Sequence, residues 1–205
     1  MDPKRIVTAG YDRIADTYAA WVAQGGGEHR QRRLALLAAA LPEGARILDL
    51  GCGSGVPVAR QLAERFDVTG LDISARQIEL ARANVPSATF LQADMATAPF
   101  PPGSFDAVVA FFSIIHLPRD EHAALFQTIA GWLRPGGWFV ASTGVYADPG
   151  TVEDDWLGAP MYWSSPPRAA TLDMVRASGM EIIEASEGDD RGGRRASDVS
   201  VGRCA

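Results

Sequence analysis

The sequence predicts an α/β fold in which a doubly wound, mostly parallel sheet lies between layers of helices. Three observations support this prediction. Short apolar segments of strand length alternate with segments of helical composition along the chain. The first apolar segment, residues 46–50, continues through a glycine-rich turn into a helix, which is how nucleotide-binding units of such folds begin. The 205 residues suffice for one domain with a substantial core and are few for two.

The glycine-rich turn comprises residues 49–55, with the sequence DLGCGSG. Glycine lacks a Cβ atom, so it permits positive φ and lets a ligand approach the backbone closely. Residues 56–65 then predict a helix with Pro57 in its first turn. A dinucleotide fingerprint requires G-x-G-x-x-G, but Val56 or Val58 stands where its last glycine is needed. The turn therefore predicts a ligand other than a nicotinamide dinucleotide, or, as the alternative, only close packing of a helix on a strand.

A carboxylate follows the second predicted strand. Residues 66–72 form this strand and end in Asp72. Ser74 and Gln77 then resemble a capping box for a helix over residues 75–84. Asp72 lies close to the interval of about 20 residues at which a carboxylate in such folds reaches a nucleotide ribose. Its two oxygens can accept from two neighbouring hydroxyls, so we expect a ribose contact; the alternative is that Asp72 merely begins a turn.

Three further strands and a helix complete the predicted core. Residues 88–92 form the third strand, residues 105–112 a nearly continuous apolar fourth strand, and residues 138–142 the fifth. A helix over residues 118–133 precedes the fifth strand and is stopped by Arg-Pro-Gly-Gly at residues 134–137. Ligands of doubly wound sheets bind at the carboxyl ends of the strands. We therefore expect the residues that follow the fourth strand to line the crevice.

In their order and spacing, these motifs resemble those of the class I S-adenosylmethionine-dependent methyltransferases, most clearly over residues 40–144. The matching motifs are the Asp-x-Gly-x-Gly-x-Gly turn, the carboxylates Asp72 and Asp94 after successive strands, and the Pro-Gly-Gly stop. The resemblance implies a Rossmann-like, doubly wound, seven-stranded, mostly parallel sheet with an antiparallel edge hairpin. The remaining elements would be a helix over residues 169–178 and hairpin strands over residues 180–187 and 195–204.

The resemblance implies S-adenosylmethionine as the cofactor. In the family, an acidic residue at the position of Asp94 contacts the adenine amino group, and the following residue, here Met95, packs against or hydrogen-bonds the ring. The Met95 side chain could equally fill an irregular gap in the core. The implied cofactor-binding residues are Asp49, Gly51, Cys52, Gly53, Gly55, Asp72, Ile73, Asp94, Met95, Phe111 and Phe112.

The first 40 residues predict a helical cap over the crevice. Tyr11, Ile14, Tyr18 and Trp21 recur at helical spacing and form one face, which must be covered. In many small-molecule members of the resembled family a tyrosine-bearing helix lies over the methionine end of the cofactor. That likeness makes Tyr11 and Tyr18 candidate catalytic residues; the alternative is an aromatic face that only docks the helix on the core.

His116 is the best candidate for a general base. It follows the end of the fourth strand, and an imidazole titrates near neutrality. A structural role ahead of a proline-started helix is the alternative. A base is needed only for some methyl acceptors.

The segment over residues 145–168 is too long and too aromatic for a simple connection, so we interpret it as a lid or substrate loop. Its aromatic rings suit a planar acceptor by stacking or an ammonium by cation–π attraction. A role in folding alone is the alternative. The candidate acceptor-binding residues are Trp156, Met161, Tyr162 and Trp163.

Composition narrows the class of partner. The 19 basic and 25 acidic residues give a formal net charge of −6, which disfavours a nucleic-acid substrate. No apolar stretch approaches the roughly 20 residues of a membrane span, and no signal-like segment stands at the start. The two cysteines suggest no disulfide framework, and no His, Cys or carboxylate cluster has metal-ligand spacing. We expect a cytoplasmic monomer or homodimer that acts on a small molecule without a metal.

We expect a single domain over residues 1–205. It would comprise a cap (1–40), a cofactor-binding core (41–144), a lid (145–168), and a last helix with edge strands (169–205). The leading function is methyl transfer from S-adenosylmethionine to an oxygen or nitrogen of a small-molecule acceptor. The alternatives are an S-adenosylmethionine-binding protein or non-methylating enzyme on the same fold, and a nicotinamide oxidoreductase, against which the glycine spacing counts.

Overall fold

The central feature of the computed structural model, which describes residues 2–24, 27–189 and 195–204, is a seven-stranded sheet in the order β3-β2-β1-β4-β5-β9-β8. Its strands are β1 (Arg46–Leu50), β2 (Asp67–Asp72), β3 (Thr89–Gln92), β4 (Phe105–Ala110), β5 (Leu133–Gly144), β8 (Met180–Asp189) and β9 (Arg195–Cys204). The first five pair in parallel, and β9 pairs antiparallel with both β5 and β8. The predicted doubly wound sheet with an antiparallel edge hairpin is therefore confirmed.

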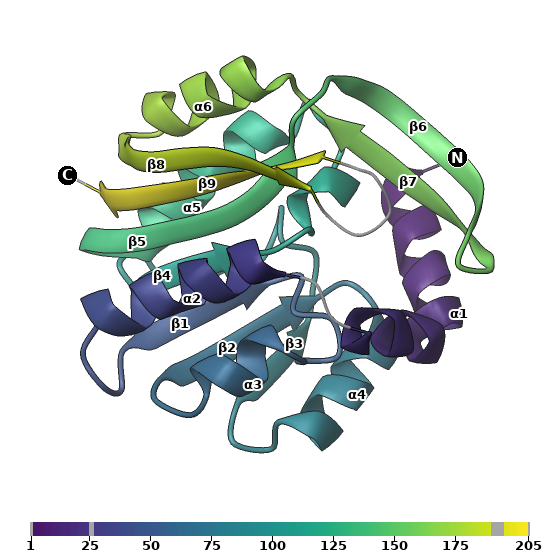
Figure 1. Cartoon of the computed structure of the whole chain (residues 1–205), viewed down its shortest axis with the longest axis horizontal. Coiled ribbons are helices and arrows are strands. Elements are labelled where there is room, and N and C mark those ends of the chain that lie inside the picture. The colour runs from purple at the N-terminus through teal and green to yellow at the C-terminus, as the bar shows by residue number, and fades with distance from the viewer. Residues whose placement is uncertain (1, 25–26, 190–194, 205) are drawn as a thin grey trace.

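Helices cover both faces of this sheet (Figure 1). One layer holds α2 (Glu28–Ala40), α3 (Val58–Leu62) and α4 (Ala75–Asn84), and the other holds α5 (His122–Trp132) and α6 (Arg168–Ala177). Side chains alternate between the layers: Ile47 and Val109 pack toward the first, and Leu48 and Val108 toward the second. Burial on both faces explains why these strands are almost continuously apolar in sequence.

The Pro-Gly-Gly motif lies inside β5, whereas the sequence predicted it just before the strand. The pairing of β4 with β5 shifts between Phe105 and Ala107, and four residues of β5, 134–137, loop out there. Arg134 pairs through Nη1 with Oδ1 of the buried Asp106 at 2.6 Å. The backbone N–H of Arg46 donates to the other oxygen of Asp106 at 2.6 Å. Asp106 therefore holds the bulge against the start of β1.

The predicted lid is an ordered hairpin and not an irregular loop. It forms β6 (Asp148–Trp156) and β7 (Ala159–Ser165), which pair with each other in a separate two-stranded sheet. Leu157 and Gly158 connect the strands with φ of 55° and 101°. Positive φ at both central residues is typical of tight hairpin turns, but leucine is rare there. The sequence signal for the hairpin was weak for that reason.

The N-terminal helix α1 (Pro3–Ala23) packs against this hairpin. Its first turn is capped by Asp2, whose side chain accepts from the backbone N–H of Lys4. Figure 1 shows α1 and the hairpin together on one side of the molecule, beyond the ends of β1 and β2. They share a small core that includes Val7, Ile14 and the fully buried Met161. Within the described residues, no helix has both the length and the apolar character needed to cross a bilayer.

At Gly10, α1 and β7 approach each other closely. A Cβ atom at this position would lie 2.8 Å from the carbonyl oxygen of Pro160 and 2.8 Å from Cε of Met161.

We expect Gly10→Ala to push α1 away from the hairpin and to lower the free energy of unfolding by about 1–3 kcal/mol. Urea denaturation measures this change. Gly131→Ala is the matched control, because Gly131 also lies in a helix and its added Cβ would meet nothing within 4 Å; it should stabilise by up to about 1 kcal/mol. Equal stability of the two variants would contradict the close approach.

Candidate active site

A pocket opens at the carboxyl ends of β1, β2, β3 and β4, and α1 lies along one side of it. This is the position predicted for a ligand of a doubly wound sheet. The predicted residues that line it are Tyr11, Tyr18, Asp49, Gly51, Cys52, Gly53, Asp72, Ile73, Asp94, Met95, Phe111, Phe112 and His116. The structure thus brings together candidate residues from α1, three strand ends and the segment after β4.

The glycine-rich turn forms the floor of the pocket. Gly51 has φ of 72°, and a Cβ atom there would lie 2.2 Å from Cβ of Ser113. Ser113 in turn donates its hydroxyl proton to the carbonyl oxygen of Leu50 at 2.6 Å. Gly55 lies outside the pocket: its Cβ position faces Val85 and Phe90 at 3.2 and 3.3 Å. The absence of a side chain at Gly51 therefore lets the turn after β1 approach the segment after β4. At Gly55 it lets the turn pack closely against the end of α4 and against β3.

Asp72 organises the turn from the end of β2. One oxygen of its carboxylate accepts from the backbone N–H of Gly53 and the other from that of Ser74, each at 2.9 Å. Burial raises the pKa of Asp72 to about 6, although these two backbone hydrogen bonds oppose the shift. Each oxygen retains a further lone pair. The carboxylate can therefore still accept from hydroxyl groups of a ligand.

Asp49 and Arg30 place opposite charges in the pocket. Asp49 is 1% exposed, and burial, together with the charge of Asp72, raises its pKa to about 7 while Arg30 opposes the shift. Oδ2 of Asp49 and Nε of Arg30 are buried and have no hydrogen-bond partner among the described residues. Buried polar atoms are rarely left so in native structures. The two groups are therefore suited to a ligand that carries both charges.

The segment after β4 forms another wall. Phe112 has φ of 56°, in the left-handed region that non-glycine residues seldom occupy. Such a conformation costs of order 1 kcal/mol and is often retained at functional sites. The chain then turns into a short 3-10 helix, Ile114–His116, which presents His116 to the pocket.

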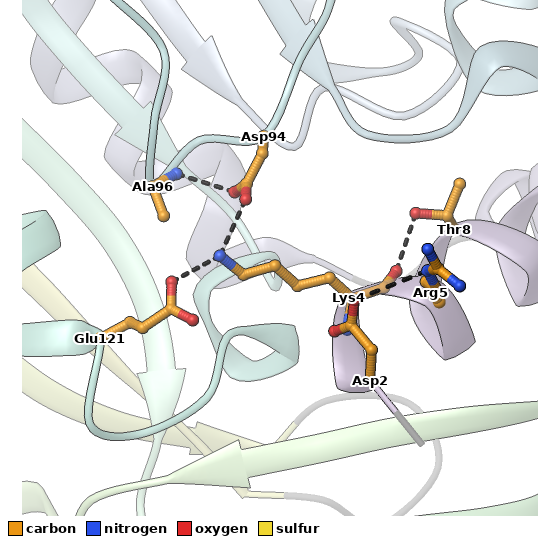
Figure 2. Close-up of polar contacts among 7 residues, drawn as sticks. All are labelled: Asp2, Lys4, Arg5, Thr8, Asp94, Ala96 and Glu121. Carbon is orange, nitrogen blue, oxygen red and sulfur yellow. Dashed lines mark hydrogen bonds and ion pairs between the residues drawn. The ribbon is translucent and has the colours of Figure 1, made fainter.

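An ion-pair cluster closes the side of the pocket that holds Asp94 (Figure 2). Nζ of Lys4 donates to Oδ2 of Asp94 at 2.8 Å and to Oε2 of Glu121 at 2.5 Å. The backbone N–H of Ala96 donates to Oδ1 of Asp94 at 2.9 Å. Burial lowers the pKa of Lys4, but its hydrogen bonds to the two carboxylates outweigh this effect and leave the pKa raised. The start of α1 is thus fixed to the end of β3 and to the residue that precedes α5.

Aromatic side chains of α1 gather around His116. The hydroxyl of Tyr11 lies 2.9 Å from Nε2 of His116, and Nδ1 of His116 lies 2.8 Å from the carbonyl oxygen of Tyr162. The Tyr11 and Tyr18 rings meet edge to face, with centroids 5.2 Å apart. Burial raises the pKa of Tyr18 to about 12, so its hydroxyl remains a hydrogen-bond donor.

The four candidate acceptor residues of the hairpin do not line this pocket. They lie behind it, where they pack against α1 and His116. Trp156 contacts the Tyr11 and Tyr18 rings at centroid distances of 5.8 and 5.7 Å, and the Trp163 ring lies 4.5 Å from that of His116. Met161 is buried and Tyr162 contributes its backbone carbonyl. These contacts make the hairpin a support for the pocket residues, and direct acceptor binding by its side chains stays a prediction.

Two charged pocket residues, Lys4 and Arg30, were not found by the sequence analysis. Lys4 pairs with a residue 90 positions away, and Arg30 of α2 interacts with Tyr18 of α1 and with Asp49 at the end of β1. No local motif marks either residue. Only the folded chain brings them to the pocket.

Comparisons with known proteins agree with this geometry. A family model described as a methyltransferase domain matches residues 47–137. O-methyltransferase rstn1 of Aspergillus nomiae is 33% identical over an alignment of 165 residues, and the alignment covers 75% of this chain and 72% of rstn1. The 27-O-demethylrifamycin SV methyltransferase of Amycolatopsis mediterranei is 40% identical over an alignment of 110 residues, which covers 49% of this chain and 40% of that protein. The structure of magnesium protoporphyrin IX methyltransferase from Synechocystis with bound S-adenosylmethionine shares the fold, with a TM-score of 0.74, 18% identity, and coverage of 99% of this chain and 98% of that one.

The chain belongs to the class I S-adenosylmethionine-dependent methyltransferases. Its cofactor is S-adenosylmethionine, and the pocket fits this molecule. The amino-acid end of the cofactor carries an ammonium and a carboxylate, which complement the unpaired polar atoms of Asp49 and Arg30. The free lone pairs of Asp72 suit the ribose hydroxyls.

Cofactor affinity should depend on the ionisation of Asp49. With a pKa of about 7, Asp49 is mostly protonated at pH 6 and mostly ionised at pH 7.5, and only the ionised form attracts an ammonium. Ionisation of Asp49 should lower the Kd for S-adenosylmethionine about eightfold between pH 6 and pH 7.5, and ionisation of Asp72 should lower it about twofold more, which makes about sixteenfold in all. Titration calorimetry at the two pH values measures this change. Asp49→Asn should keep only the roughly twofold change expected from Asp72 with its pKa of about 6; a flat profile in the unaltered protein would exclude this role of Asp49.

Lys4 should hold the start of α1 against the core. Lys4→Met removes both ion pairs, so we expect faster amide exchange in the first turns of α1 and a loss of about 1 kcal/mol in stability. Hydrogen exchange followed by mass spectrometry locates the effect. Arg5→Met is the matched control, because the Arg5 side chain is 87% exposed and its nearest carboxylate, on Asp2, is 3.9 Å away. Equal exchange in both variants would show that the Lys4 cluster does not anchor the helix.

Proposed function

We propose that this methyltransferase acts on a hydroxyl oxygen of a small, largely apolar aromatic acceptor. The observation that carries the proposal is the meeting of Tyr11, Tyr18 and His116 at one side of the cofactor pocket. Aromatic faces suit a planar ring, and an imidazole next to them suits removal of a hydroxyl proton. Two relatives are named for O-methylation, rstn1 and the rifamycin enzyme, which supports oxygen over nitrogen as the accepting atom.

The residues of this chain would contribute positioning and proton removal. When bound, S-adenosylmethionine supplies an electrophilic methyl group on its sulfonium. Tyr11 and Tyr18 would hold the acceptor ring and exclude water, so that the hydroxyl oxygen stays in line with the methyl group. His116 would be the final acceptor of the hydroxyl proton, because a neutral alcohol or phenol is a poor nucleophile. Oxygens of weakly acidic phenols gain most from such a base.

The net charge of −6 further favours an uncharged acceptor over a polyanion. The proposed acceptor is therefore a small phenolic compound without phosphate groups.

The proposal predicts that the protein converts S-adenosylmethionine to S-adenosylhomocysteine only when a phenol is present. Incubation with 4-methoxyphenol, 4-methylphenol and 4-nitrophenol, followed by mass spectrometry, would detect the methyl ethers, and aniline serves as the matched nitrogen acceptor. We expect ether formation to exceed N-methylation by at least tenfold. Binding of S-adenosylmethionine without turnover of any acceptor would instead support a binding protein or non-methylating enzyme. Preferred methylation of aniline would contradict the choice of oxygen.

A further inference from the structure

The hydrogen bonds around His116 determine which of its nitrogens carries a proton. Nδ1 faces the carbonyl oxygen of Tyr162 at 2.8 Å, and a carbonyl oxygen can only accept. Nδ1 must therefore carry the hydrogen. In the neutral ring Nε2 then has a free electron pair, and the hydroxyl of Tyr11, 2.9 Å away, donates to it.

Tyr11 and His116 both line the pocket, and the Tyr11 hydroxyl occupies the hydrogen-bonding position of Nε2 through which the His116 ring would otherwise meet an acceptor. We propose that the Tyr11 hydroxyl, and not the His116 ring, meets the acceptor hydroxyl, and that the proton passes through Tyr11 to His116. The inference rests on the proposed function and specifies how its proton is removed. It makes Tyr11 a catalytic residue and the Tyr162 carbonyl a positioning group.

The transfer balances in one concerted step. The acceptor O–H bond breaks and its proton bonds to the Tyr11 oxygen, while the Tyr11 O–H bond breaks and its proton bonds to Nε2 of His116. The acceptor oxygen uses its electron pair to form the new O–CH₃ bond, and the pair of the breaking S–CH₃ bond stays on sulfur. The products are an ether, a neutral thioether and a protonated imidazole, which returns its proton to water after product release.

Tyr11 needs its partner for this role. Burial raises the pKa of Tyr11 well above its ordinary value, and Tyr18 and Asp72 raise it further. A free tyrosinate is therefore disfavoured, so Tyr11 cannot act as a base alone. When the proton moves on to His116 within the same step, no tyrosinate accumulates.

Trp163 favours the charged product of the relay. Its ring lies 4.5 Å from the His116 ring at an interplanar angle of 39°, and its Nε1 donates to Oε2 of Glu153 at 3.1 Å. The electron-rich face of an indole attracts a cation. The imidazolium that forms during transfer is thus stabilised by β7, the same strand that holds Nδ1 through Tyr162. The hairpin thus sets the tautomer of His116 and places an aromatic ring beside it.

The tautomer can be measured without any acceptor. A long-range ¹H–¹⁵N spectrum of the protein at pH 8 should show His116 with a protonated Nδ1 and an unprotonated Nε2. Only three histidines are present, so His29→Gln and His122→Gln identify the His116 signals by elimination. Tyr11→Phe should shift the Nε2 signal toward that of a nitrogen without a hydrogen bond. A protonated Nε2, or a signal unmoved by Tyr11→Phe, would overturn the relay.

Kinetics with phenols of different acidity tests the step itself. On 4-methoxyphenol, whose proton must be removed, Tyr11→Phe and His116→Gln should each lower kcat about 100-fold, and the double variant should lose no more than either single one. On 4-nitrophenol at pH 8, which is already ionised, both variants should stay within about threefold of the unaltered protein. Tyr146→Phe, at a residue exposed outside the pocket, is the matched control.

The two proposals fail in different ways. Lack of methylation of every phenol would overturn the proposed function, while the spectrum would still test the relay geometry. Full activity of Tyr11→Phe beside an inactive His116→Gln would show that His116 meets the acceptor directly. Equal losses on 4-methoxyphenol and 4-nitrophenol, with the Kd for S-adenosylmethionine unchanged, would assign Tyr11 to packing of the acceptor and overturn the relay.

Discussion

The carboxylate of Asp72 is the interaction on which the rest of the site depends. It binds the backbone of the glycine-rich turn through Gly53 and the start of α4 through Ser74. The hydroxyl of Ser74 caps α4 by accepting from the N–H of Gln77, and it donates its own proton to Asp12 of α1 at 2.6 Å. One buried carboxylate therefore orders the pocket floor, one helix beside it and, through Ser74, the helix that covers it.

The second interaction on which the pocket depends is the contact between α1 and the β6–β7 hairpin. Both segments lie outside the seven-stranded sheet, and they meet at Gly10 and Met161 and around the aromatic rings near His116. Acceptor binding by the side chains of the hairpin stays a prediction. In the structure, the Tyr162 carbonyl and the Trp163 ring of the hairpin contact His116, so a segment outside the sheet fixes the orientation of this pocket residue.

Charge is distributed unevenly across the pocket. Asp49, Asp72 and Arg30 are gathered near the glycine-rich turn, and Lys4 neutralises Asp94 at another side. The low-dielectric surroundings that raise the pKa values of Asp49 and Asp72 also strengthen their attraction to a cationic ligand. Tyr18 lies within the influence of both Arg30 and Asp72, so the aromatic and charged parts of the pocket adjoin each other.

The sequence by itself determined the parallel core, the glycine-rich turn and the carboxylates at the ends of β2 and β3, because these follow from local periodicity and from motifs whose residues are close in the chain. It could not determine the hairpin, whose tight turn uses a leucine at positive φ. Nor could it determine which residues meet in the pocket. Lys4 and Asp94 are 90 positions apart, and Tyr11 and His116 are 105 apart. Such pairs leave no periodic signal, since only tertiary packing brings them within hydrogen-bond distance and fixes the tautomer of the imidazole.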